Sequence, residues 1–207
     1  MCVGRISTGT QGNRIYSING KSTTLSANGG GLGANTGLYA EPVDVDIAVS
    51  DMPLKQKDII HEVIGNTVFV KGKQYPIKLK DGHYKIRRLS VDECKRLQTI
   101  PQEYRMPCSN AQNYKMLGNG WTCAVISHIL SFIPNIKNED VEVLSMYDGM
   151  SCAQIALNAI GANVVKYYAT EIDKYAIQTC MANFPDTIQL GDAFQAREKY
   201  FIRRLRT

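Results

Sequence analysis

One stretch, residues 141–160 (VEVLSMYDGMSCAQIALNAI), constrains the fold of this chain more than any other. An apolar run ends at Asp148-Gly149, and a helical pattern follows at once with four apolar residues on one face: Ala153, Ala156, Leu157 and Ile160. A strand, a tight glycine turn and a helix in this order open a nucleotide-type α/β unit, in which a ligand lies beyond the carboxyl end of the strand. The sequence therefore predicts a parallel α/β fold in this region.

Two further strand ends carry acidic residues. Glu171 closes the apolar run 164–170, about 20 residues after the glycine turn, where such folds place a carboxylate on ribose hydroxyls. A helix from Asp173 to Met181 stops at Phe184-Pro185, and a third strand, 187–190, leads into Gly191-Asp192. Each residue alone is also typical of a cap or a turn. Three acidic strand ends in succession favour a ligand site, although a dinucleotide remains open as the ligand.

Two helices are expected before this unit. Ser90 to Glu93 forms a capping box that starts the first, with Val91, Cys94 and Leu97 facing inward. Gly118-Asn119-Gly120 precedes the second, whose apolar stripe is Trp121, Val125, Ile129 and Phe132. The pair could simply be two core helices joined by a loop. The alternative is a helix N-terminus whose free amides suit an anionic or polar ligand.

The N-terminal half predicts a small β lobe. Arg14 to Ser17 and Thr23 to Ala27 are expected to form a hairpin, leading into the glycine-rich loop 28–33. That loop is either a flexible linker or a backbone that approaches a ligand or a DNA strand closely. A short helix is expected at 57–64. Glycine turns separate three further expected strands, 67–70, 74–79 and 83–86, whose lysines face either solvent or DNA.

Composition excludes several classes of protein. No apolar run approaches the ~18 residues of a membrane span, and the N-terminus has no apolar signal core. The six cysteines are scattered without a C-x-x-C pair, which suggests a reducing cytoplasm and offers no metal site. The net charge of +5 is compatible with DNA but does not require it. A basic, helical tail is expected over 197–207.

Five segments together resemble the DNA cytosine-5 methyltransferases, especially the compact versions carried by bacteriophages and bacteria. SMYDGMSCAQIAL, ATEIDKYAI and IQLGDAF are similar to the family's first three motifs. IRRLSVDECKRLQTIP resembles the ninth motif and YKMLGNGWTCAVISHIL the tenth. The stretch from Gly4 to Tyr39 resembles the end of the target-recognition region that precedes the ninth motif.

The resemblance implies a Rossmann-like fold that binds S-adenosylmethionine and double-stranded DNA. The turn would hold the methionine part of the cofactor, Glu171 the ribose hydroxyls and Asp192 the exocyclic amine of adenine, while Asn119, Gly120 and Trp121 would close over it. The complete implied cofactor set is Tyr147, Asp148, Gly149, Met150, Ser151, Glu171, Ile172, Asp192, Ala193, Asn119, Gly120 and Trp121. The implied DNA contacts are Arg14, Gly29, Gly30, Gly31 and Arg88. The turn lacks G-x-G-x-x-G, which favours the methyl donor over a dinucleotide.

Two departures from the family pattern stand out. The first three motifs follow the ninth and tenth, so a circular permutation is expected, with three regions: a partial recognition region and β lobe at 1–85, the two motif helices at 86–135 and the cofactor half at 141–207. The family's nucleophile motif (Pro-Cys) and its Glu-Asn-Val motif have no counterpart after Asp192. Pro107-Cys108 lies in a loop between the ninth and tenth motifs, so no catalytic residue is assigned.

Three hypotheses follow. The chain is a permuted cytosine methyltransferase, truncated or completed by a second polypeptide that carries the missing motifs. Alternatively, it is a non-catalytic module that binds S-adenosylmethionine or DNA. The third hypothesis is a gene remnant that folds poorly because its parallel sheet has an exposed edge. A role in protection from restriction and a role in regulation both remain open.

Overall fold

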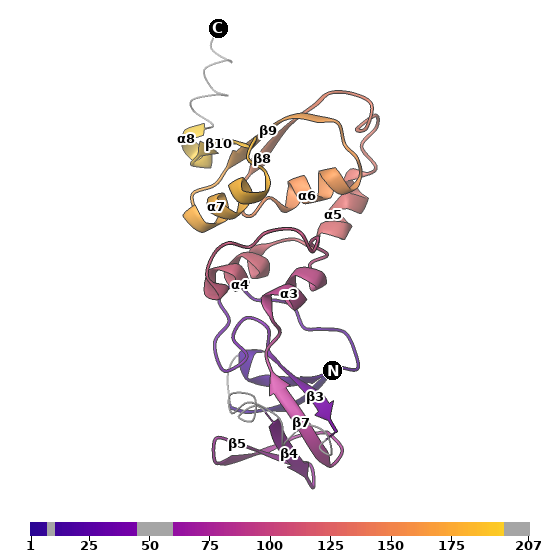
Figure 1. Cartoon of the computed structure of the whole chain (residues 1–207), viewed down its shortest axis with the longest axis vertical. Coiled ribbons are helices and arrows are strands. Elements are labelled where there is room, and N and C mark those ends of the chain that lie inside the picture. The colour runs from indigo at the N-terminus through magenta and orange to yellow at the C-terminus, as the bar shows by residue number, and fades with distance from the viewer. Residues whose placement is uncertain (8–10, 45–59, 197–207) are drawn as a thin grey trace. The chain divides into compact units, whose positions relative to one another are not determined.

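The computed structural model describes residues 1–7, 11–44 and 60–196 (Figure 1). The chain divides into two compact units, Met1–Ser90 and Val91–Thr207. Strands dominate the first unit, and the second has three successive helices followed by alternating strands and helices. The presence of both helices and strands confirms the α/β class expected from the sequence. The helical tail predicted over 197–207 lies outside the described residues.

The first unit is built on a seven-stranded sheet in the order β1-β2-β3-β7-β4-β5-β6. β2 and β3 are parallel, and all other neighbouring pairs are antiparallel. A single turn of 3-10 helix, Gln11–Asn13, precedes β2. The strands are β1 Cys2–Arg5, β2 Arg14–Ser17, β3 Leu38–Val43, β4 Ile60–Ile64, β5 Thr67–Val70, β6 Lys73–Pro76 and β7 Gly82–Arg87.

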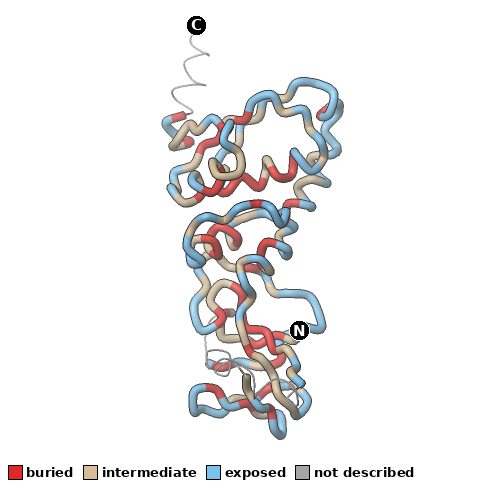
Figure 2. The backbone as a smooth tube through the Cα atoms, viewed as in Figure 1, coloured by how far each residue is buried: buried red, intermediate tan, exposed pale blue. Residues whose placement is uncertain are grey.

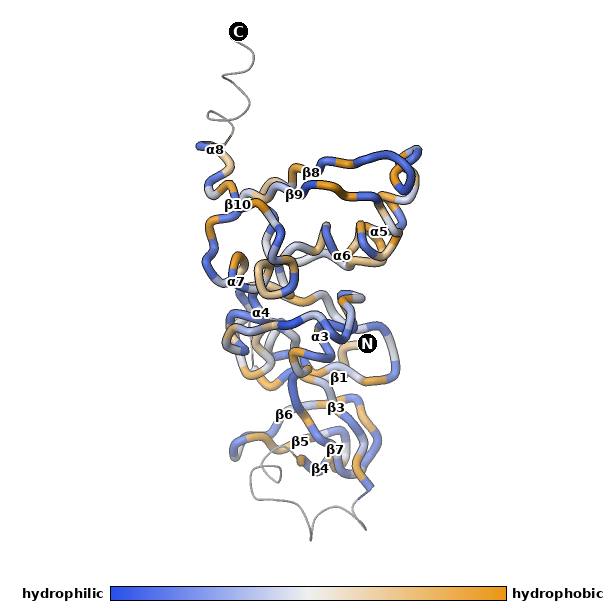
Figure 3. Tube along the Cα trace, turned by 45° about the horizontal axis from the view of Figure 1, so that its top comes forward, coloured by the Kyte–Doolittle hydropathy of each residue, from blue (hydrophilic) through white to orange (hydrophobic). Residues whose placement is uncertain are grey.

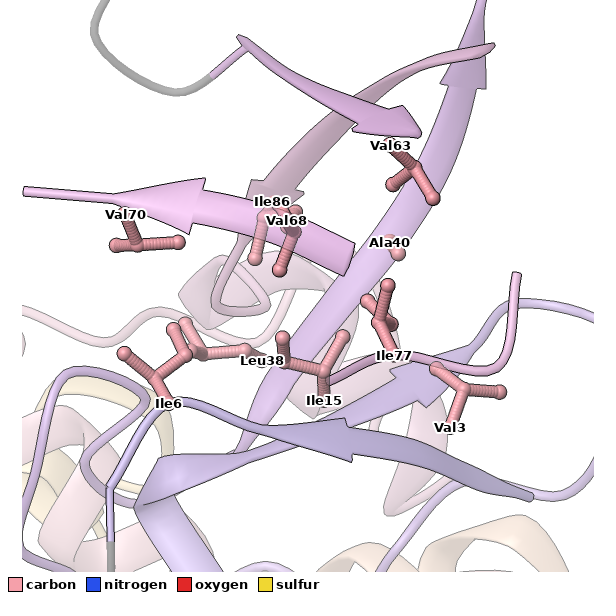
Figure 4. Close-up of a cluster of buried hydrophobic side chains, with 10 residues drawn as sticks. All are labelled: Val3, Ile6, Ile15, Leu38, Ala40, Val63, Val68, Val70, Ile77 and Ile86. Carbon is pink, nitrogen blue, oxygen red and sulfur yellow. The ribbon is translucent and has the colours of Figure 1, made fainter. Parts of the chain in front are cut away.

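This sheet curls until its two outer strands meet. The Lys78 amide donates to the Val3 carbonyl at 2.6 Å, and Gly4 bridges Ile77 just after β6. The curled sheet surrounds one apolar core to which nearly every strand contributes (Figure 4). Along β5 the alternation is plain, because Val68 and Val70 are buried while Phe69 between them is exposed. The core of the curled sheet consists of Val3, Ile6, Ile15, Leu38, Ala40, Val63, Val68, Val70, Ile77 and Ile86.

The hairpin expected after β2 is wrong. β2 pairs with β1 and β3, and residues 23–27 form no strand. The side chain of Asn35 donates to the carbonyls of Ser26 and Ala27, and the Ser26 amide donates to the Asn35 carbonyl at 2.9 Å. These backbone groups of Ser26 and Ala27 are therefore bonded to Asn35 and not to a neighbouring strand.

The short helix expected at 57–64 is also wrong where the structure describes it. Residues 60–64 form β4, between β7 and β5, and 57–59 lie outside the described residues. Val63, opposite Gly82 of β7, is almost fully buried. This segment is rich in β-branched residues, and its pairing with β7 and β5 makes a strand more stable than a helix.

The glycine-rich loop 28–33 is packed against its own chain. A Cβ atom at Gly12 would lie 1.7 Å from the Gly30 carbonyl oxygen, and one at Gly33 would lie 2.6 Å from the Gly12 oxygen. The Gly33 amide donates to that same Gly12 oxygen at 2.7 Å. The close backbone approach for which glycine is suited is thus made within the unit, which argues against a flexible linker.

The second unit contains a parallel three-stranded sheet in the order β10-β9-β8. Its strands, β8 Val141–Met146, β9 Val164–Thr170 and β10 Ile188–Gly191, agree with the sequence prediction to within a residue or so at each end. Two crossover helices join them, α6 Cys152–Ala159 and α7 Lys174–Asn183. Three further helices precede β8, α3 Val91–Leu97, α4 Asn110–Asn119 and α5 Cys123–Leu130, and α8 Ala193–Ala196 follows β10.

Many of the buried residues of this unit lie on α4, α6, α7 and the middle strand β9 (Figure 2). Leu157 of α6 packs with Tyr167 and Ala169 of β9 and with Ile136 from the segment before β8. α5 packs beside α6, where the Ser127 hydroxyl donates to the Ala156 carbonyl at 3.2 Å. These contacts hold α6 between β9 and α5.

The outer face of α5 departs from the expectation of a buried helix. α5 is mostly hydrophobic in sequence (Figure 3). Trp121, Val125, Ile129 and Phe132 are nevertheless 53%, 55%, 57% and 73% exposed, so the apolar stripe faces outward. α5 also ends at Leu130, before Phe132. In α3, Cys94 is buried as expected, whereas Leu97 is exposed and not inward-facing.

Candidate functional site

The turn between β8 and α6 has an unusual backbone. Tyr147, Gly149 and Ser151 have φ values of 56°, 60° and 61°, a region that L-residues other than glycine seldom adopt. Thr170 of β9 holds the turn, because its hydroxyl accepts from the Tyr147 amide at 3.1 Å and its carbonyl from the Asp148 amide at 2.9 Å. Strain of this kind persists only where the surroundings enforce it, and it is concentrated at ligand sites.

Asp148 faces into the protein beneath the turn. One carboxylate oxygen accepts from the Tyr167 hydroxyl at 2.7 Å, and the other accepts from the hydroxyl of the fully buried Ser151. Burial and the nearby Asp148 charge raise the pKa of Tyr167, so its hydroxyl remains a donor. Asp148 and Ser151 therefore hold the turn in shape.

A tyrosine from the loop after α3 supports the same turn. The buried Tyr104 hydroxyl donates to the Met150 carbonyl, and the ring packs on Phe184 with centroids 6.2 Å apart. Desolvation by burial is the main reason that the pKa of Tyr104 is raised. The turn is thus held from the sheet side by Thr170 and from the helical side by Tyr104.

Replacing Tyr104 by phenylalanine is expected to lower the free energy of unfolding by about 1–2 kcal/mol, because the Met150 carbonyl loses its buried donor. Urea unfolding followed by the fluorescence of Trp121, the single tryptophan, measures this in the second unit. Tyr168→Phe on β9 is the control in the same unit, since the Tyr168 hydroxyl makes no hydrogen bond within the described residues. Equal effects of the two variants would contradict a special role for Tyr104.

Glu171, at the carboxyl end of β9, has a fixed carboxylate. Its Oε2 accepts from the Gly149 amide at 2.8 Å, and its Oε1 accepts from the amides of Ile172 and Asp173 at 2.7 and 2.8 Å. Three backbone donors orient the carboxylate and link the turn to the start of α7. Three of the about four lone-pair sites of the carboxylate are thus used, so the remaining acceptor capacity for a ligand is on Oε2.

The end of α4 forms the opposite wall. Gly118 and Asn119 are its last residues, and the Gly120 amide donates back to the Met116 carbonyl at 2.8 Å. The expected helix N-terminus at Gly-Asn-Gly is therefore wrong, because α5 begins only at Cys123. A Cβ at Gly120 would lie 3.2 Å from Met150 Cε and 3.3 Å from Cys152 Sγ, so this glycine permits close approach to the turn.

These elements enclose a cavity of about 220 Å³. It brings together eight of the predicted cofactor residues: Asn119, Gly120, Trp121, Tyr147, Asp148, Gly149, Met150 and Glu171. Ser151 is buried beneath it, and Ile172, 77% exposed, is not among the lining residues. Asp192 and Ala193 also lie outside the lining, and the Asp192 carboxylate accepts from the Phe194 amide at 2.9 Å at the start of α8.

Sequence reasoning missed two charged residues of this cavity. Lys115 of α4 and Asp173, the N-cap of α7, form an ion pair with Nζ and Oδ2 2.9 Å apart, and both line the cavity. An aspartate directly before a helical pattern is a sign of an N-cap, which the sequence displays. Nothing local marks Lys115, because its partner lies 58 residues away.

Of the cysteines, Cys152 lines the cavity and the others do not. Cys108, of the Pro-Cys pair, lies 3.6 Å from the Tyr175 carbonyl and Thr179 hydroxyl of α7 and does not line the cavity. Cys152 lines it but is buried, and a hydrogen bond with the Cys123 thiol lowers the Cys152 pKa and raises that of Cys123. Burial raises the pKa of Cys94 to about 12. Among the described residues, no cluster of three or more possible metal ligands occurs.

Comparison with known families identifies the chain. Residues 10–135 match the family model of C-5 cytosine-specific DNA methylases, a range that covers more than half of the chain. The chain belongs to this family. The matched range includes α4 and α5, whereas the β8–α6 turn and Glu171 lie beyond it.

Two methylases illustrate the relationship. The type II methyltransferase M.HhaI of Haemophilus parahaemolyticus is 30% identical over 131 residues, which are 63% of this chain and 26% of that protein. DNA (cytosine-5)-methyltransferase DRM2 of Oryza sativa subsp. japonica is 24% identical over 129 residues, 61% of this chain and 20% of the relative. The matches thus span about a quarter or less of these methylases. None of the helices in the described ranges has the length and apolar character needed to cross a membrane.

Proposed function

We propose that the cavity of the second unit binds S-adenosylmethionine and that the chain supplies the cofactor half of a DNA cytosine-5 methyltransferase. The observation that carries the proposal is the oriented carboxylate of Glu171, held by the Gly149 amide at a strand end beside the cavity. Members of the family use this cofactor, and two ribose hydroxyls are suitable donors to such a carboxylate.

The remaining cavity residues suit the other parts of the cofactor. The Tyr147–Met150 turn would hold the methionine part, with Asn119, Gly120 and Trp121 closing over it from the α4–α5 side. Asp192 would accept a hydrogen bond from the adenine amine, with Ile172 and Ala193 beside the base. Asp192 follows β10, which pairs with β9, so its position at the same sheet edge supports this role.

The order of the parts supports a circular permutation. The match to the family ends at residue 135, just before the linker into β8. Ile136 anchors that otherwise exposed linker, since it is buried with Leu157 and Tyr167, and its carbonyl accepts from the Asn163 amide at 2.9 Å. A short connection between α5 and β8 is what joining the tenth motif directly to the first requires.

We further propose that methyl transfer needs a second polypeptide with the Pro-Cys and Glu-Asn-Val motifs. The one Pro-Cys pair in the sequence packs against α7 away from the cavity. In the described part of the chain β8 is an edge strand of the three-stranded sheet, and an exposed strand edge can pair with another chain. Beside it, apolar residues of α5 and β8 line a groove of about 690 Å³ that could receive further elements.

Double-stranded DNA is the proposed substrate, contacted through the first unit. Arg14 begins β2, Gly29, Gly30 and Gly31 lie in the packed loop, and Arg88 follows β7. The buried Nε of Arg14 has no hydrogen-bond partner within the described residues. Arg14 as a whole is half-buried, and guanidinium groups are common donors to the phosphate backbone.

Two measurements test the proposal. Calorimetry should show binding of S-adenosylmethionine by the chain alone, and failure to bind would refute the cofactor site. Transfer of a radiolabelled methyl group to cytosine should occur only after a second polypeptide with the missing motifs is added. Cofactor binding without transfer under those conditions would favour a non-catalytic binding module.

A further inference from the structure

The Lys115–Asp173 ion pair links two walls of the cavity that come from distant parts of the sequence. Lys115 lies on α4, and Asp173 precedes α7. Their charged atoms are 2.9 Å apart, with the side chains 42% and 29% exposed. Both residues line the cavity, and neither belongs to the set implied by the sequence.

Asp173 connects this pair to Glu171. Its Oδ2 accepts from Lys115 at 2.9 Å, and its Oδ1 accepts from the Tyr175 amide at 2.9 Å. Its own backbone amide donates to Glu171 Oε1 at 2.8 Å. A change in the position of Asp173 therefore moves one of the three donors that orient the Glu171 carboxylate.

Each member of the pair stabilises the charged form of the other. The hydrogen bond from Lys115 is the main cause of the lowered pKa of Asp173, and the same bond is the main cause of the raised pKa of Lys115. The Glu171 charge also raises the pKa of Lys115. Partly exposed pairs contribute little to stability, so an effect on ligand geometry is the more telling consequence.

We propose that Lys115 is a positioning residue which, through Asp173, holds the Glu171 carboxylate in place for the ribose hydroxyls of an adenosine-containing ligand. The inference rests on the proposed function. It assigns to α4 a role in cofactor affinity besides forming the wall of the cavity. Lys115 itself need not contact the ligand.

A double-mutant cycle on ligand affinity tests the proposal. The dissociation constant of S-adenosylhomocysteine is measured by calorimetry for the parent, Lys115→Met, Asp173→Asn and the double variant. Each single change is expected to weaken binding about fivefold, and the double variant should be no weaker than either, because one linkage is lost in all three. Lys115→Arg should bind within about twofold of the parent, since a guanidinium can also donate to the Asp173 carboxylate.

The chain provides a matched control pair. Lys166 and Glu142 are also 2.9 Å apart, on β9 and β8, and neither lines the cavity. Lys166→Met and Glu142→Gln should leave the dissociation constant unchanged, and thermal unfolding verifies that every variant is folded.

The possible outcomes separate the two proposals. Three results would overturn the positioning role and leave the cofactor site standing. They are unchanged affinity in the single variants, additive losses of affinity in the double variant, and weakened binding by Lys115→Arg. Absence of binding by the parent would overturn the proposed function itself and this inference with it.

Discussion

Replacing Glu171 by alanine is expected to raise the dissociation constant of S-adenosylmethionine about a hundredfold or more. A hydrogen bond to a charged group contributes about 1.5–3 kcal/mol, and the ribose would lose this acceptor. The substitution also leaves the Gly149, Ile172 and Asp173 amides without the carboxylate that now accepts from them. The turn and the start of α7 would therefore lose a common anchor. Isothermal calorimetry measures the change directly.

Two further variants make this result specific. Glu142→Ala removes an exposed carboxylate from β8 of the same sheet and should bind as the parent does. Glu171→Gln keeps one acceptor oxygen and should fall between alanine and the parent. Thermal unfolding distinguishes lost binding from lost structure. If a folded Glu171→Ala variant retained parental affinity, the cavity would not be the cofactor site.

Replacing Gly12 by alanine is expected to lower the free energy of unfolding of the first unit by about 3 kcal/mol or more. The new Cβ would lie 1.7 Å from the Gly30 carbonyl oxygen and 2.9 Å from that of Ala34. Both obstacles are backbone atoms, so no side-chain rotation relieves the contact. The 28–33 loop would have to separate from the Gln11–Asn13 turn, which would break the bond from the Gly33 amide to the Gly12 carbonyl.

Gly65→Ala is the matched control for the cost of adding a methyl group. Gly65 has φ of +55° and nothing within 4 Å of its added Cβ, so only backbone strain of about 1–2 kcal/mol applies. Denaturant-dependent hydrogen exchange of the β2 and β3 amides reports on this unit separately from the second. A smaller effect for Gly12→Ala than for Gly65→Ala would show that the loop is not packed as described.

The second unit shows how well periodic patterns predict structure. β8, α6, β9 and α7 lie where apolar runs and helical spacing indicated, because the pattern of each element is defined by its own sequence. The two errors in the first unit have the opposite cause. Residues 23–27 and 60–64 are short and weakly patterned, so the partners available in the folded unit decided their structure.

The candidate site was predictable to the extent that it depends on strand ends. Parallel strands bring their carboxyl ends to one edge, so the β8 turn and Glu171 were expected to lie together, and they line one cavity. The contributions of Lys115 and Tyr104 were not predictable. Both come from segments before the sheet, and their partners Asp173 and Met150 are distant in sequence.

The sequence by itself determined the family, the α/β class and the acidic strand ends, since motifs and periodicity are local properties of the chain. Only the tertiary structure decided which way the Tyr147–Ser151 turn faces, because Thr170, Tyr167 and Tyr104 hold it through contacts between distant segments. The same holds for the outward-facing stripe of α5 and for the glycine loop packed on Gly12. Those features depend on which surfaces meet when the chain folds, and no local pattern records that.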